Sequence, residues 1–262
     1  MIRTSKYYGW NPSRPDWRDA KFAFRPKVCH LADRVDLRGA NMPPVYDQLA
    51  IGSCTSNAIA AAYDYTHASE GLRFINPSRL FIYANERIME GTALTNDSGA
   101  QIRDGVKCVS TMGVCPETEW PYIETKFSAA PPKECYESAL KDLVLEYQSV
   151  GQLEIMAVMN QPQPKPVVIG FTAYEGFESA DVARTGIVSM PLRNESVVGG
   201  HAVLVVGYDL NAATYLCRNS WSEDWAMGGY FTLPFNYVHN PDLASDFWLL
   251  SKVSVDPKQK FG

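Results

Sequence analysis

The sequence predicts an α+β fold, in which helices occupy the first half of the chain and strands the second. Two observations support this prediction. Between residues 54 and 147, apolar side chains recur at the three- and four-residue spacing of helices that bury one face. From residue 167 onward, short runs of β-branched and aromatic residues, such as Val167–Phe171 and His201–Tyr208, are typical of buried strands. Because helices and strands do not alternate, a parallel sheet built of βα units is not expected.

Local signals place the individual elements. Helices are expected over residues 54–65, 80–91, 101–112, 132–147 and 153–160. Asn76-Pro77-Ser78 is a start signal for the second helix, and Gly113 is the expected C-cap of the third. After the Pro-rich residues 161–166, strands are expected over residues 167–171, 201–208, 214–219, 229–233 and 247–253.

The sequence predicts that the first 34 residues form an irregular arm and that residues 254–262 form a short tail. Residues 9–19 mix turn-forming residues with Trp10 and Trp17 and show no helical period. Since exposed pairs of tryptophans are uncommon, we expect this arm to pack on the body of the protein.

Composition and charge narrow the classes of function. The 262 residues are 46% hydrophobic and 20% charged, which suffices for one large domain or two lobes with a full core. The net charge of −5 and the lack of a dense Lys/Arg block argue against binding to nucleic acid or an anionic membrane. No apolar run approaches the ~20 residues of a membrane span, and no signal-peptide core is visible. We therefore expect a cytoplasmic protein, unless a signal peptide has been removed.

The six cysteines are too sparse for a disulfide scaffold. They are Cys29, Cys54, Cys108, Cys115, Cys135 and Cys217. None lies in a Cys-x-x-Cys motif, so a zinc site is not expected, and neither is another metal or an organic cofactor. Reduced thiols are the simplest interpretation, although one or two disulfides are compatible with the spacing.

The stretch around Cys54 contains the candidate nucleophile. Gln48 lies six residues before Cys54, Gly52-Ser53 lies directly before it, and an apolar helical run follows. A thiolate in the first turn of a helix faces unpaired backbone N–H groups and the positive end of the helix dipole, which favour the anion. The Gln48 amide and the Cys54 backbone N–H could donate to a tetrahedral oxyanion. Taken alone, however, Cys54 could be one buried cysteine among six.

Two downstream stretches supply the partners that such a thiol needs. Gly200-His201-Ala202 opens an apolar strand, and Arg218-Asn219-Ser220-Trp221 follows another strand. A free thiol is mostly protonated near neutral pH, so His201 would take its proton and later protonate the leaving amine. Asn219 would hold the imidazole in one tautomer without adding a charge, and Trp221 would shield that bond from water.

Together these stretches resemble the papain-like cysteine peptidases. That family places its His and Asn ~130–150 residues after the Cys, and here the intervals are 147 and 165 residues. The resemblance implies a papain-like two-lobed fold over residues 35–253. A helical lobe at about 45–150 would carry the Cys, and a barrel-like antiparallel β lobe at about 151–253 the His and Asn. It implies that protein or peptide substrates are hydrolysed through a Cys54 thioester, without a metal or cofactor.

The resemblance also implies where a substrate would bind. Ser98-Gly99 matches the loop whose backbone pairs with the substrate chain. Ala100, Ile169 and Ala202 fall near the positions that line the pocket for the second residue before the scissile bond, and Trp221 lies close to that site. This small, apolar set suggests a hydrophobic substrate residue in that pocket.

Two departures from the family pattern stand out. Ile51 replaces a cysteine, so the usual disulfide beside the nucleophile cannot form, which fits a cytoplasmic or prokaryotic-type member. Only about 30 residues precede Val35, too few for the long helical propeptide that is usual in the family. Residues 10–17 would either lie across the cleft as a short pro-segment or form a packed strap. Other functions stay open: another acyl transfer on the same site, namely by an exopeptidase, deamidase or transglutaminase-type enzyme, or an inactive papain-like binding module.

Overall fold

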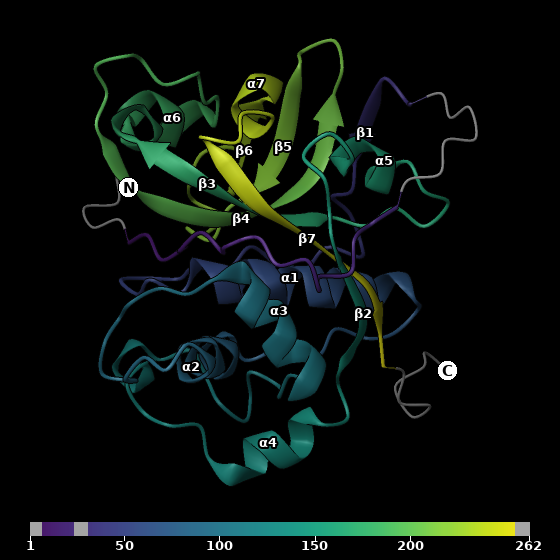
Figure 1. Cartoon of the computed structure of the whole chain (residues 1–262), viewed down its shortest axis with the longest axis vertical. Helices are drawn as coiled ribbons and strands as arrows, with labels where there is room; N and C mark the ends of the chain where they lie inside the picture. The colour runs from purple at the N-terminus through teal and green to yellow at the C-terminus, as the bar shows by residue number, and fades with distance from the viewer. Residues whose placement is uncertain (1–6, 24–30, 255–262) are drawn as a thin grey trace.

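The structure is a computed structural model that describes residues 7–23 and 31–254. Within these residues it has a helical lobe below and a β lobe above, and helix α1 lies along the seam between them (Figure 1). All strand pairs of the seven-stranded sheet are antiparallel. The predicted α+β class is therefore confirmed.

Helix α1, Cys54–Ser69, is the central helix of the molecule. Its residues from Cys54 to His67 are buried on every side of the helix, because it is covered by β4 and β7 from above and by α2 and α3 from below. On every side of such a buried helix, the side chains must be apolar or must form hydrogen bonds within the protein. The run of small residues from Ala60 to Ala62 allows this close approach.

The remaining helices of the lower lobe follow their sequence signals, with one exception. Helix α2 is Arg79–Met89, and its N-cap Ser78 accepts from the backbone N–H of Phe81 as expected. Helix α3 is Ile102–Thr111, and Gly113 follows it at φ +81°. Helix α4 is only Lys133–Ala139, and the last four residues of the helix predicted for 132–147 belong to strand β2, Val144–Ser149. That part of the prediction is wrong because β7 offers a row of backbone partners to residues 144–149.

The sheet runs in the order β2-β7-β3-β4-β5-β6, and β1 pairs with β4 beside this path. The strands are β1 Arg34–Asp36, β3 Val167–Tyr174, β4 Val197–Asp209, β5 Thr214–Arg218, β6 Tyr230–Pro234 and β7 Ala244–Val253. Short helices flank it: α5 Ile155–Met159, α6 Ala180–Thr185 and α7 Phe235–Val238, with 3-10 turns at Glu124–Lys126 and Glu175–Glu178. Among the described residues the edge strands β2 and β6 do not pair, so the expected barrel-like lobe is an open sheet.

Strand β4 separates two hydrophobic cores by the alternation of its side chains. Val203 and Val205 face the core of the upper lobe. Ala202, Leu204 and Val206 face the second core, which they share with α1. Since successive strand residues point to opposite faces, β4 serves both lobes, and its His201–Ala202 end lies on the seam.

The arm occupies the same seam, where it passes between α1 and the sheet (Figure 1). Trp10 is buried at 5% exposure, whereas Trp17 is 88% exposed. The expectation that the arm packs on the body is confirmed for Trp10 and is wrong for Trp17. In the described residues, no helix combines the length and apolar character that a bilayer crossing requires.

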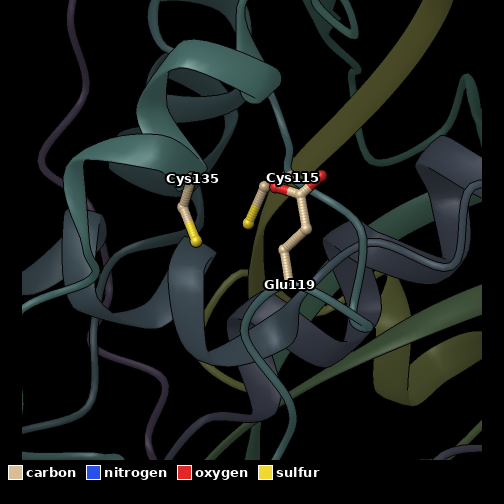
Figure 2. Close-up of side chains that lie close together, drawn as sticks. All are labelled: Cys115, Glu119 and Cys135. Carbon is tan, nitrogen blue, oxygen red and sulfur yellow. The ribbon is translucent and has the colours of Figure 1, made fainter.

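All five cysteines within the described residues are buried and free. Cys29 lies outside the described residues. Cys115 and Cys135 point toward one another in the helical lobe, with Glu119 beside them (Figure 2). The other three described cysteines are not members of this group.

Candidate active site

Cys54 is the first residue of α1 and lies at the seam. Its Sγ accepts from the backbone N–H of Ala202 at 3.4 Å, which brings the thiol next to the residue after His201. Burial raises the pKa of the Cys54 thiol to about 12, against the opposing effect of N–H donors from Ala202, Gly9 and Thr55. The N–H donors favour the thiolate, as the sequence predicts for a helix start, but in this arm-covered state the loss of water outweighs them.

His201 and Asn219 form the second half of the site. His201 Nε2 lies 2.8 Å from Asn219 Oδ1, and both residues are buried. The same Oδ1 accepts from the Ser220 backbone N–H at 2.8 Å, which fixes the amide with its oxygen toward the imidazole. Nε2 must then carry a hydrogen, and Nδ1 is the basic nitrogen of the neutral ring. The Trp221 ring lies 5.1 Å from the His201 ring and covers it from water.

Gln48 comes from the helical side and is fully buried. Its Oε1 accepts from Ser220 Oγ at 2.7 Å, so the amide NH₂ points the other way. Nε2 donates to the carbonyl of Ile51 at 2.8 Å and to the carbonyl of Tyr7 at 3.2 Å. The structure thus aims a Gln48 N–H at a backbone carbonyl of the arm, which is the geometry that an oxyanion donor needs.

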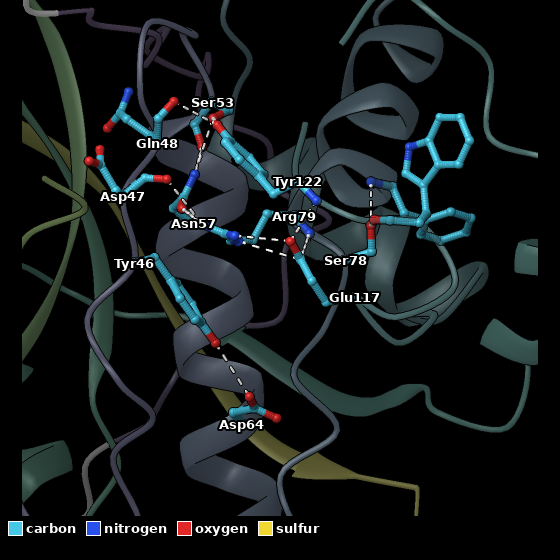
Figure 3. Close-up of polar contacts among 12 residues, drawn as sticks. Tyr46, Asp47, Gln48, Ser53, Asn57, Asp64, Ser78, Arg79, Glu117 and Tyr122 are labelled. Carbon is cyan, nitrogen blue, oxygen red and sulfur yellow. Dashed lines mark hydrogen bonds and ion pairs between the residues drawn. The ribbon is translucent and has the colours of Figure 1, made fainter. Parts of the chain in front are cut away.

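Tyr122 supports this part of the site from behind, and sequence analysis did not single it out (Figure 3). Its hydroxyl donates to the Gln48 backbone carbonyl at 2.8 Å. Because that uses the only phenolic proton, the 2.6 Å contact with Ser53 Oγ must be donated by Ser53. Tyr122 therefore ties the residue before Cys54 to the backbone of Gln48.

Arg79 connects the same layer to α2 (Figure 3). It pairs with Glu117 at 3.0 Å and donates to the Asp47 carbonyl and to Asn57 Oδ1, both at 3.2 Å. Its guanidinium also lies over the Tyr122 ring, 4.0 Å from the ring centre. An arginine at a helix start and a glutamate 38 residues later carry no sequence signal of this pairing, because only the fold brings them together.

The arm fills the space in front of Cys54. The Gly9 carbonyl accepts from the Ala100 N–H at 2.7 Å, and the Trp10 N–H donates to the Gly200 carbonyl at 2.9 Å. A Cβ on Gly9 would lie 1.7 Å from the Gly52 carbonyl oxygen, so only glycine fits there. The backbone of the arm is thus held by both walls of the seam.

Two side chains of the arm cover the rest of the site. The Tyr8 ring meets the His201 ring edge-on at 5.6 Å, and its hydroxyl donates to Glu178 at 2.8 Å. The Trp10 ring lies so close to Gly170 that a Cβ there would be 2.0 Å from it. Trp10 Nε1 donates to Asp246 Oδ2 at 3.0 Å.

The residues expected to bind substrate lie around the arm, with one exception. The Ser98 carbonyl accepts from the Asn11 side chain at 3.0 Å. Gly99, at φ +69°, leaves room for the Gly9 carbonyl, and the Ala100 backbone pairs with Gly9 and Asn11.

The exception is Ile169, whose side chain packs in the core of the β lobe and does not line the seam. Its neighbours Val168 and Gly170, on the other face of β3, meet the same side as Trp10 and Ala202. The pocket-lining position of β3 was assigned one residue away from the one that faces the seam. Because alternate residues of a strand face opposite sides, this shift places the side chain on the other face of the sheet.

A buried thiol, an imidazole and an amide on one seam between a helical and a β lobe define a class, the thiol-dependent hydrolases of two-lobed fold. Residues 31–247 match the family described as papain family cysteine protease. The chain belongs to this family, and it is a cysteine-type peptidase, a hydrolase.

Individual relatives agree with this assignment. A peptidase C1-like protein of Acanthamoeba polyphaga mimivirus is 38% identical over 278 residues, which cover 97% of this chain and 89% of that protein. The crystal structure of xylellain, a cysteine protease from Xylella fastidiosa, superposes with a TM-score of 0.87 at 37% identity, over 95% of this chain and 98% of the other. Digestive procathepsin L 3 of Tenebrio molitor shares the fold at 20% identity and a TM-score of 0.69, over 88% and 74% of the two chains.

Proposed function

We propose that this chain hydrolyses peptide bonds through a thioester on Cys54. The His201 imidazole takes the thiol proton, the sulfur attacks the carbonyl carbon, and the C–N bond breaks as the imidazolium protonates the leaving amine. Water then hydrolyses the thioester, with His201 again as the base, and frees the carboxylic acid. The observation that carries this proposal is the contact of Cys54 Sγ with the residue after His201, while His201 itself is held by Asn219.

The donor side of the proposal rests on Gln48. Its Nε2 and the Cys54 backbone N–H would bind the oxyanion, each contributing roughly 3 kcal/mol to the transition state. The carbonyl of Tyr7 accepts from Nε2 in the structure, so it stands in for the carbonyl of a substrate. Ser220 and Tyr122 keep the Gln48 side chain and backbone in place.

We also propose that the arm is the inhibitor of its own site. Gly9 and Trp10 use the backbone groups of Ala100 and Gly200 that a substrate chain would need. Tyr8 covers the imidazole, and burial keeps the Cys54 thiol protonated by raising its pKa to about 12. Activity then requires that residues 7–11 leave the seam.

The occupied positions indicate a substrate preference. Trp10 lies against Gly170 in the apolar cluster that contains Ala202. When the arm leaves, that space would take a large hydrophobic side chain of the substrate, in line with the hydrophobic preference expected from the sequence.

The test compares three chains under reducing conditions: the full chain, Cys54→Ala, and a chain cleaved after residue 11 by an inserted protease site. Each is given a fluorogenic peptide library and an epoxide that alkylates thiolates. We expect turnover and labelling in the cleaved chain, little of either in the full chain, and none in Cys54→Ala. Turnover that persists in Cys54→Ala would refute the nucleophile. Equal turnover of full and cleaved chains would refute inhibition by the arm and leave the peptidase assignment intact.

A further inference from the structure

Cys115, Glu119 and Cys135 form a cluster of potential metal ligands in the helical lobe, away from the seam (Figure 2). One ligand atom of each residue lies within 4.8 Å of the other two. Cys115 follows α3 and Cys135 lies on α4, so 19 residues separate them in the sequence. This distance is why cysteine spacing alone argued against a zinc site.

The separation of the ligand atoms suits one small ion. Zn²⁺ binds sulfur at ~2.3 Å and carboxylate oxygen at ~2.1 Å, so in a tetrahedral site two of its ligand atoms lie ~3.6–3.8 Å apart. The ligand atoms here lie within 4.8 Å of one another, so side-chain shifts of up to about 1 Å bring them to this spacing. Two thiolates with one carboxylate favour a thiophilic ion of the zinc class over Mg²⁺ or Ca²⁺, which prefer oxygen ligands.

The surroundings hold the three ligands in place. The Cys115 carbonyl accepts from the Ser78 N–H at 2.8 Å. The Ser138 hydroxyl, one turn after Cys135, shares its single proton between Glu119 Oε2 and the Cys135 carbonyl, which lies 3.2 Å away. Oε1 is then the carboxylate oxygen available to an ion, and such outer contacts are what orient metal ligands.

The burial of the three residues and the charge of the filled site are also compatible with a bound cation. The two cysteines are buried at 0% and 1% exposure, whereas Glu119 is exposed, so an ion could enter from its side. We propose that Cys115, Glu119 and Cys135 bind one thiophilic divalent cation, with water as the fourth ligand. Binding releases two protons from the thiols, and the site then carries a net charge of one minus.

A bound ion would link α4, through Cys135, to the segment after α3, through Cys115 and Glu119. That segment continues to Glu117 and Tyr122, which contact Arg79 and the Gln48 backbone. The proposal does not depend on the peptidase mechanism, because its ligands take no part in the chemistry at Cys54.

The experiment uses the full chain carrying Cys54→Ala, so that the candidate nucleophile cannot bind the ion. The protein is stripped with a chelator, kept under a phosphine reductant, and titrated with Co²⁺. We expect a thiolate-to-cobalt charge-transfer band that saturates at one ion per chain and disappears when Zn²⁺ is added. Added Zn²⁺ should also raise the unfolding temperature.

Matched variants on this background assign the ligands. Cys135→Ala should lose the band, and the control Cys108→Ala, also a buried cysteine, should keep it. Glu119→Gln changes an exposed residue and leaves the fold intact, and it should weaken Co²⁺ binding about tenfold or more. The proposal is overturned if the parent shows no band, if the band survives Cys135→Ala, or if Glu119→Gln binds as tightly as the parent. A Cys115–Cys135 disulfide that persists under the reductant would also overturn it.

Discussion

The two tryptophans of the arm lie seven residues apart and have opposite environments. Trp10 is buried at 5% exposure, lies on Gly170 and donates to Asp246, whereas Trp17 is 88% exposed. The backbone does not share this difference: Gly9, Trp10 and Asn11 bond to both walls of the seam, and Ala20 and Phe22 bond to Ser149. Later arm residues are anchored as well, since Ser13 donates to Asp246 at 2.7 Å and Asp19 pairs with Arg103 at 2.7 Å. The contrast is therefore between two side chains of the arm, and the arm as a whole is held along its length.

The largest expected effect comes from Gly9→Leu. A side chain at this position meets the Gly52 carbonyl oxygen, so the arm cannot remain seated. A clash of at least about 4 kcal/mol would raise epoxide labelling of Cys54 by on the order of 10³-fold. Labelling rates of the variant and the parent, measured at one pH, check this. An unchanged rate would mean that the arm does not control access.

Trp10→Ala should release the arm less completely. Removing a buried tryptophan costs about 3 kcal/mol, so labelling should rise on the order of 10²-fold. The matched control is Trp17→Ala, which should stay within about 0.5 kcal/mol of the parent, because an exposed side chain makes few contacts. Similar effects of the two substitutions would contradict the contrast between the two tryptophans.

The pH dependence of epoxide labelling should distinguish the state in which the arm covers Cys54 from the state in which the arm is released. In the covered state the pKa of Cys54 is raised to about 12, so the thiolate fraction, and with it alkylation, should rise about tenfold per pH unit from 7 to 10. The covered state binds the thiol proton more tightly than the released state. Its stability is therefore full at low pH and falls as pH rises through the pKa of the released thiol. In Gly9→Leu the profile should level off near neutral pH, and a steep profile there would contradict release.

Tyr8→Phe should have the smallest effect. It removes only the hydrogen bond to Glu178 and keeps the ring against His201. A loss of about 1 kcal/mol corresponds to roughly fivefold faster labelling. A change as large as that of Trp10→Ala would show that the hydroxyl, and not the indole, holds the arm.

Much of the fold could be predicted because the relevant signals are local. Ser78 caps α2, and Gly113 adopts the positive φ that ends the α3 segment. Strand β2 could not be predicted, because residues 144–149 become a strand only through pairing with β7. Ile169 shows the same limit at the site, since its residue type suits either face of a strand and only the register selects one.

The site itself divides in the same way. Gln48, Cys54, His201 and Asn219 lie in recognisable stretches, and the structure brings them to one seam. Tyr122 and Arg79 act over long sequence distances and carry no such pattern. The contribution of Gly9 was also hidden, because the need for a glycine comes from the Gly52 carbonyl, which lies far away in the sequence.

Ser220 connects the two lobes through hydrogen bonds to Gln48, and this connection limits how the arm can leave the seam. Its carbonyl accepts from the Gln48 N–H at 2.9 Å and its hydroxyl donates to the Gln48 side chain, and Ser222 bonds to Tyr46 close by. These hydrogen bonds connect the two lobes beside Cys54. A hinge motion that separates the lobes would therefore have to break them. The arm must instead leave one residue after another. Because Ser13, Asp19 and Phe22 also bond to the body, an enzyme that cuts just after Pro12 would separate residues 7–11 from these anchors.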